Sequence, residues 1–187
     1  ILVAIVVITL IAIHIFEVVN TYLNSCYIKS TIDGNVYLVR NTPKKQETAD
    51  TLATLNVNIE RLIRSLQHKD HREYQTVVDR LSGYKHTSLS ENILQKDTSF
   101  TVNKKDINVC LTTRNRDNNI YDINLLMFVL IHELAHYCSA SIGHNKEFID
   151  NFKFLLKKAI DAGVYRYEDY SQSNKEYCGI KIKNNIL

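Results

Sequence analysis

The hydrophobic pattern of the chain begins with a nearly unbroken apolar run. Residues 1–19 are apolar except for Thr9, His14 and Glu17, and the two ionisable residues lie toward the far end of the run. About 20 apolar residues suffice to span a bilayer as a helix, so the run predicts a transmembrane anchor over residues 1–19. The run shows no charged leading segment and no small-residue cleavage site, which favours an uncleaved anchor over a signal peptide. A helix buried in a soluble protein is the alternative that this pattern leaves open.

The pattern after the run predicts one compact domain over residues 20–187, a length too short for two comfortable domains. An Asp-Gly pair at positions 33–34 lies between two strand-like runs and predicts a hairpin. Pro43 then suits the first turn of a helix. Apolar residues at helical spacing follow it, and this stripe predicts a helix packed on a core: Leu52, Leu55, Ile59, Leu62, Ile63 and Leu66.

Shorter elements are predicted further along the chain. Residues 73–81 read as a helix that ends at Gly83, and residues 89–111 have the β-branched character of two or three strands. Ile107, Val109 and Leu111 alternate with other residues, so one face of the last strand is predicted to be buried.

The densest apolar stretch of this domain leads into the motif His-Glu-Leu-Ala-His at positions 132–136. In a helix His132 and His136 lie on one face and can bind a single ion. Glu133 is rotated by about 100° from His132, which lets it act as general base on an activated water. The alternative is a pair of polar surface histidines. The apolar surroundings argue against it, because buried polar groups cost free energy unless they are bonded.

A catalytic zinc usually has three protein ligands and one open position, so a third ligand is expected. His144 is the predicted third ligand, since it follows the turn-prone Gly143 and precedes a second amphipathic helix. The apolar stripe of that helix is Phe148, Phe152, Leu155, Leu156 and Ala159. A metzincin would instead place its third histidine at position 142, where this chain has isoleucine.

Further groups near the third ligand are candidates for supporting roles. Glu147 and Asp150 are within reach on the following helix and are candidates to orient the imidazoles. A donor to the developing oxyanion is also expected. Four tyrosines follow the third ligand and none is singled out among them: Tyr165, Tyr167, Tyr170 and Tyr177.

Three segments carry a resemblance to a known family: S-F-T-V-N-K-K-D-I-N-V-C-L, Y-D-I-N-L-L-M-F-V-L-I-H-E-L-A-H and G-H-N-K-E-F, all within residues 99–148. They resemble the WLM/SprT-like zinc metallopeptidases, especially the membrane-anchored WLM-like proteins of nucleocytoplasmic large DNA viruses. The resemblance implies an α+β, zincin-like domain in which a small sheet packs on helices. It also implies that His132, His136 and His144 bind Zn²⁺ and that Glu133 is the base. By the same resemblance, residues 108–111 are the expected edge strand for an extended substrate. The gap between the second and third histidines is longer than in WLM proteases of the DNA-repair type.

Net charge and cysteine spacing bear on the expected partners and on the redox state of the thiols. With 23 basic and 20 acidic residues the net charge is +3, so charge gives no argument for a nucleic-acid partner. Four cysteines without C-x-x-C spacing are expected to be reduced thiols, although a bridge from Cys110 to Cys178 or to Cys138 stays open.

Together these features predict a single-pass zinc metalloprotease of a virion or host-cell membrane that hydrolyses protein or peptide substrates. One alternative is a zinc-stabilised membrane or virion assembly component without turnover, against which the intact Glu133 argues. Another is a protease acting on DNA-bound proteins, against which the anchor and the balanced charge argue.

Overall fold

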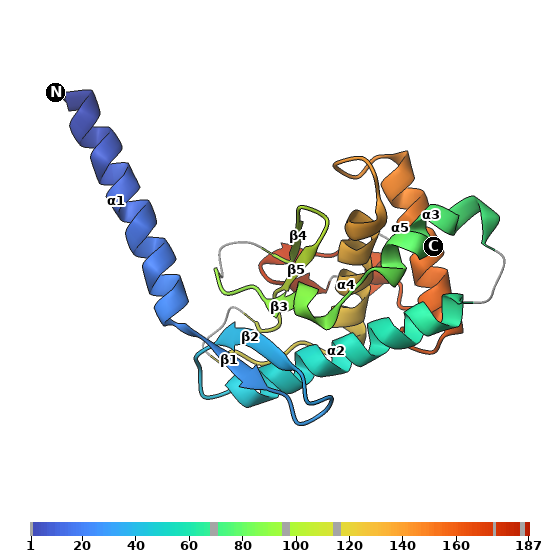
Figure 1. Ribbon diagram of the computed structural model, residues 1–187. Coiled ribbons are helices and arrows are strands. Elements are labelled where there is room, and N and C mark those ends of the chain that lie inside the picture. The colour runs from blue at the N-terminus through green and yellow to red at the C-terminus, as the bar shows by residue number, and fades with distance from the viewer. Residues whose placement is uncertain (1, 68–70, 95–97, 114–116, 174, 184–185) are drawn as a thin grey trace.

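The N-terminal run forms one long helix that projects from the rest of the protein (Figure 1). The computed structural model describes residues 2–67, 71–94, 98–113, 117–173, 175–183 and 186–187. Within them α1 (Leu2–Leu23) is the one helix long and apolar enough to cross a membrane, a property that N-terminal signal sequences share. None of its residues is buried against the rest of the described chain, which does not favour the alternative of a helix buried in a soluble protein. The helix also continues to Leu23, beyond the predicted end at Val19.

A hairpin follows α1 directly. Strands β1 (Ser25–Lys29) and β2 (Val36–Arg40) pair antiparallel, and the turn between them contains Gly34 at φ +73°, as the Asp-Gly pair predicts. The Asp33 carboxylate accepts hydrogen bonds from the Asn35 backbone N–H at 3.0 Å and the Tyr37 hydroxyl at 2.5 Å, which fixes this turn. The predicted hairpin is confirmed.

Helix α2 (Lys45–Leu66) lies under the hairpin and packs against β2, β3, α4 and α5 (Figure 1). The predicted stripe is buried in it with the exception of Ile63, which is only partly buried. The predicted short helix is present as a 3-10 turn, η1 (Arg72–Tyr74), continued by α3 (Gln75–Ser82), and it ends at Gly83.

The second sheet has the strand order β3-β5-β4, with η2 (His86–Ser88) leading into it. Strand β3 (Leu89–Glu91) is parallel to β5 (Asp106–Val109), and β4 (Phe100–Val102) is antiparallel to β5. Ile107 and Val109 are fully buried, as predicted. The prediction that residues 108–111 form an edge strand is wrong, because Asn108 is paired on both sides, with Ser90 and with Phe100. The edge next to α4 is β4.

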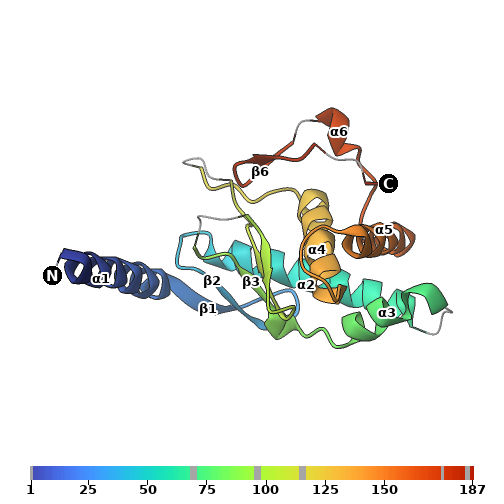
Figure 2. The same ribbon diagram turned by 90° about the horizontal axis from the view of Figure 1, so that it is seen from above.

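Helices α4 (Ile123–Cys138) and α5 (Lys146–Asp161) pack on each other and complete the core. The stripe predicted for the second of them is buried throughout. After α5 the chain returns past α4 to the sheet (Figure 2), through α6 (Tyr170–Ser173), β6 (Glu176–Tyr177) and β7 (Ile180–Lys181). The coarse prediction of a mixed α+β fold, with small sheets on helices, is confirmed.

The expectation of four reduced thiols is wrong, because Cys110 and Cys178 form a disulfide. Of the two pairings left open for Cys110, the structure has the one to Cys178. Cys26 and Cys138 are free, and burial raises the pKa of the Cys138 thiol to about 12.

Candidate metal centre

Helix α4 positions two of the predicted ligands. The Asp122 side chain caps its first turn by accepting from the backbone N–H groups of Asn124 and Leu125, at 3.0 and 3.3 Å. Leu130 and Leu134 bury the core-facing side of the helix. His132 and His136 consequently lie one turn apart, with ring centroids separated by 4.9 Å.

The third histidine comes from the ligand loop, residues 139–143, and the residue after it. Helix α4 ends at Cys138, so Gly143 lies in the loop rather than at the helix end, and its φ of +84° is a conformation that favours glycine. Asn145 then caps α5 by accepting from the backbone N–H of Phe148 at 3.1 Å. His144 is thus fixed between a turn and a helix start.

The three imidazoles converge. His144 Nε2 is 3.1 Å from His136 Nε2 and 3.1 Å from His132 Nε2. Four-coordinate zinc with Zn–N bonds of about 2.0–2.1 Å separates its nitrogen ligands by roughly 3.3 Å. Among the residues that the structure describes, these three are the one group of His, Cys, Asp or Glu side chains able to share an ion. The structure therefore brings together all three predicted ligands.

The surroundings favour imidazoles that present lone pairs. Burial, together with the neighbouring His136 and His144, lowers the pKa of His132 to about 3. Burial and the neighbouring His144 lower the pKa of His136 to about 4. Phe148 stacks on the His136 ring at 4.2 Å, and Phe152 meets the His132 ring edge-on at 5.2 Å. Neutral imidazoles at this spacing fit a zinc ion, because metal ligands must be deprotonated.

Glu133 lies beside the ligands with its side chain buried. Thr101 of β4 donates a hydrogen bond to Glu133 Oε2 at 2.8 Å. Burial raises the pKa of Glu133 to about 7, against the lowering effect of the Thr101 hydrogen bond. A carboxyl with such a pKa can exchange a proton near neutrality, as a general base must.

Two charged residues bind the backbone of the ligand loop. The Lys104 ammonium donates to the carbonyl oxygens of Ser139, Ala140 and Ser141, the last at 2.9 Å. The Glu147 carboxylate accepts from the backbone N–H groups of Ala140, at 2.7 Å, and Ser141, at 3.0 Å. The Ser141 hydroxyl also donates to this carboxylate, and this bond, together with the two backbone bonds, lowers the pKa of Glu147 to about 2.

The prediction that Glu147 and Asp150 orient the imidazoles is therefore wrong. Glu147 binds the ligand loop, and Asp150 pairs with Lys146 at 2.6 Å. Sequence reasoning also missed Thr101 and Lys104. The Asn103-Lys104 pair, with φ of 50° and 54°, is a recognisable turn signal, but nothing in the sequence links it to the loop after α4.

The site lies in a cleft of about 1050 Å³ between α4, β4, α5 and the C-terminal segment. Of the four candidate tyrosines, Tyr177 alone lines this cleft, and its hydroxyl donates to the carbonyl oxygen of Cys110 at 2.7 Å. The three histidines and Glu133 all line this cleft.

Comparison with known proteins identifies relatives of this chain. The chain is 36% identical over 185 residues to the uncharacterized protein R325 of Acanthamoeba polyphaga mimivirus, covering 96% of this chain and 93% of that protein. The chain belongs to the R325 family. Two shorter matches are the uncharacterized protein 136R of Invertebrate iridescent virus 6 and the uncharacterized protein 042R of Invertebrate iridescent virus 3. Protein 136R is 41% identical over a match that covers 43% of this chain and 44% of its own length. Protein 042R is 38% identical over a match that covers 47% of this chain and 54% of its own length.

The relatives are viral proteins, in agreement with the viral origin that the family resemblance implies. No family model matches the chain, and no solved structure matches it.

Proposed function

We propose that the chain is a zinc-dependent peptidase of the zincin-like type, anchored in a membrane by α1 and acting on protein or peptide substrates. The observation that carries this proposal is the convergence of three imidazole nitrogens beside a buried carboxyl in an open cleft. The resemblance of the motif to WLM/SprT-like metallopeptidases supports the same reaction, and the exposed, apolar α1 supports the anchor.

The residues of the site have distinct roles in this proposal. Zn²⁺ held by His132, His136 and His144 would supply Lewis-acid activation of a water and of the scissile carbonyl. Glu133 takes the proton from the attacking water and gives it to the leaving amine, for which a pKa of about 7 is suited. Thr101 keeps Glu133 Oε2 in place through its hydroxyl.

Strand β4 supplies a place for an extended substrate. It is at the edge of its sheet, pairs with β5 on one side, and contributes Phe100 and Thr101 to the cleft. A peptide added to an exposed edge gains main-chain hydrogen bonds and is fixed in register. We infer that the scissile segment binds along β4, next to Glu133.

The test uses the full chain purified in detergent. Elemental analysis is expected to find one zinc per chain, lost or strongly weakened in His144→Ala and retained in the control His86→Ala, since His86 lies outside the cluster. A mixed peptide library is expected to be cleaved by the wild type. Glu133→Gln should keep its zinc and lose about 10²–10⁴-fold in rate.

Each other outcome points elsewhere. Zinc without cleavage by the wild type would favour the assembly component stabilised by its metal. Cleavage that persists in Glu133→Gln would remove the general base from the proposal, and absence of zinc would remove the metal centre.

A further inference from the structure

The C-terminal wall, defined as residues 177–183 and Ile186, forms one side of the cleft. Tyr177, Ile180, Ile182 and Ile186 line it, and residues of α4 and α5 such as Phe128 and Ile149 line the same cleft. The wall is far from the motif in sequence, and it lies there because the chain after α5 returns to the sheet (Figure 2). The metal centre and this wall therefore border the same space.

Large apolar side chains are exposed on the rim of this space. Ile180 on β7 is 49% exposed, and Ile142 in the ligand loop is 92% exposed. Both line the cleft, although they belong to different elements. Exposed apolar groups gathered around a concave site indicate that an apolar group of a ligand covers them.

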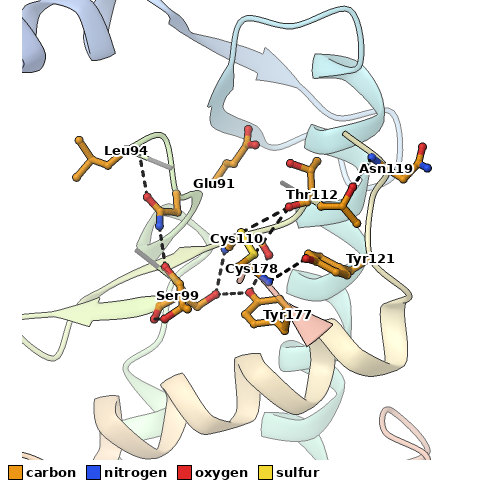
Figure 3. Close-up of a disulfide and its surroundings, with 12 residues drawn as sticks. Glu91, Leu94, Ser99, Cys110, Thr112, Asn119, Tyr121, Tyr177 and Cys178 are labelled. Carbon is orange, nitrogen blue, oxygen red and sulfur yellow. Dashed lines mark hydrogen bonds between the residues drawn. A yellow bond between two sulfur atoms is a disulfide. The ribbon is translucent and has the colours of Figure 1, made fainter. Parts of the chain in front are cut away.

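A disulfide and several hydrogen bonds attach the wall to the rest of the domain (Figure 3). Cys178 is joined to Cys110 by the disulfide, and its backbone N–H donates to the Tyr121 hydroxyl at 2.8 Å. The Tyr177 hydroxyl donates its hydrogen to the Cys110 carbonyl, so in the 2.5 Å contact with Ser99 it accepts from the serine hydroxyl. Ser99 Oγ in turn accepts from the Cys110 backbone N–H at 3.0 Å. Tyr177 and Cys178 of the wall are thus bound to Ser99, which precedes β4, and to Cys110, which follows β5.

The charged side chains that line the cleft favour one kind of substrate charge over the other. Apart from Glu133, the charged side chains that line the cleft outside the histidine cluster, among the residues that the structure describes, are lysines: Lys104, Lys181 and Lys183. Lys104 is engaged with the ligand loop, whereas Lys181 and Lys183 are exposed on the wall. A substrate with acidic groups next to its apolar side chain complements this lining better than a basic one.

We propose that the C-terminal wall completes a specificity subsite, which selects an extended polypeptide with a large apolar side chain and acidic neighbours beside the scissile bond. The inference rests on the proposed peptidase function. The disulfide is a positioning element of this subsite, since it holds the wall opposite α4.

The experiment measures binding rather than turnover. Peptide hydroxamates, which chelate zinc, are titrated calorimetrically into the zinc-loaded full chain in detergent. A leucyl side chain is expected to bind at least about tenfold more tightly than a glycyl one, as apolar pockets discriminate. Glutamate neighbours should bind a few-fold more tightly than lysine neighbours at low salt, and this difference should shrink at high salt.

Two variants test the wall itself. Ile180→Asn and the double variant Cys110→Ala with Cys178→Ala are each expected to reduce the leucyl preference to about twofold or less. The control is Ile32→Asn, at an isoleucine that is 57% exposed and not in the cleft. Equal binding of both hydroxamates to the wild type, a preference unchanged in both variants, or no hydroxamate binding would overturn the subsite. Selective binding without peptide cleavage would instead overturn the peptidase proposal and leave the subsite standing.

Discussion

The ligand loop and the C-terminal wall border the same cleft but are held by different interactions. The loop, residues 139–143, is bound by the Lys104 ammonium on its carbonyl side and by the Glu147 carboxylate on its N–H side. The wall is bound by a disulfide and by the buried Tyr177 hydroxyl. One side of the cleft therefore depends on charge, and the other on a covalent bond.

The difference follows from distance along the chain. The loop lies between two helices that pack on each other, so few further bonds are needed to fix its path. The disulfide of the wall joins residues separated by 68 positions. Closing a loop of that length costs substantial chain entropy, and a disulfide removes part of this cost from the unfolded state. The comparison predicts that the two sides can be disrupted separately.

The largest effect is expected from removal of the disulfide that holds the C-terminal wall. Replacing Cys110 and Cys178 together by alanine should lower the free energy of unfolding by about 2–4 kcal/mol. Zinc content should stay at the wild-type level, because neither cysteine is a ligand. Chemical denaturation measures the first quantity, and amide hydrogen exchange should show faster exchange over residues 176–183.

Cys26→Ala is the matched control, since Cys26 is a free cysteine in β1. It should change stability by less than about 1 kcal/mol. Loss of zinc in the double variant would mean that the wall and the metal centre are one unit, contrary to the comparison.

The same contrast between local and distant contacts explains what the sequence predicts. His132 and His136 are related by helical geometry alone, and Gly143 with the stripe of α5 locates His144. The strand over Ile107 and Val109 is readable from alternation. Alternation gives the buried face of a strand but not its neighbours, which is why an edge was predicted where β5 is paired on both sides.

Distant pairs are not encoded in any short pattern. Cys110 pairs with Cys178, and Thr101 with Glu133, only because tertiary packing brings β4, β5 and the C-terminal segment to α4. Glu147 illustrates the limit within a helix. Its position in the first turn of α5 is predictable, but its partners are the backbone N–H groups of Ala140 and Ser141 and the Ser141 hydroxyl, which no local pattern links to it.

An intermediate effect is expected from removal of the Lys104 ammonium that binds the ligand loop. Lys104→Met should weaken zinc binding by about 10–100-fold, the range found when groups that orient ligands are removed, because the loop that presents His144 loses three bonds. Competition with a chromophoric chelator measures this affinity. Lys105→Met changes the neighbouring exposed lysine and should leave it unaltered. A similar loss in both variants would show that net charge, and not the contact with the loop, is responsible.

The smallest effect concerns the pH dependence of the loop. The folded-state pKa of Glu147 is about 2 and its ordinary value is 4.5, so the protonated form is disfavoured in the folded protein. Its contribution to stability is therefore fully present above pH 4.5 and is lost as the pH falls through 4.5 toward 2. Glu147→Gln should be less stable than the wild type at pH 6, by at most about 1 kcal/mol because solvent screens this partly exposed group. The difference should disappear on acidification, as followed by denaturation of the metal-free protein. Glu176→Gln, at an exposed residue of β6, is the control and should differ from the wild type by the same small amount at both pH values. A Glu147→Gln deficit that is constant with pH would assign the effect to lost packing, and the loop would then not depend on charge as the comparison requires.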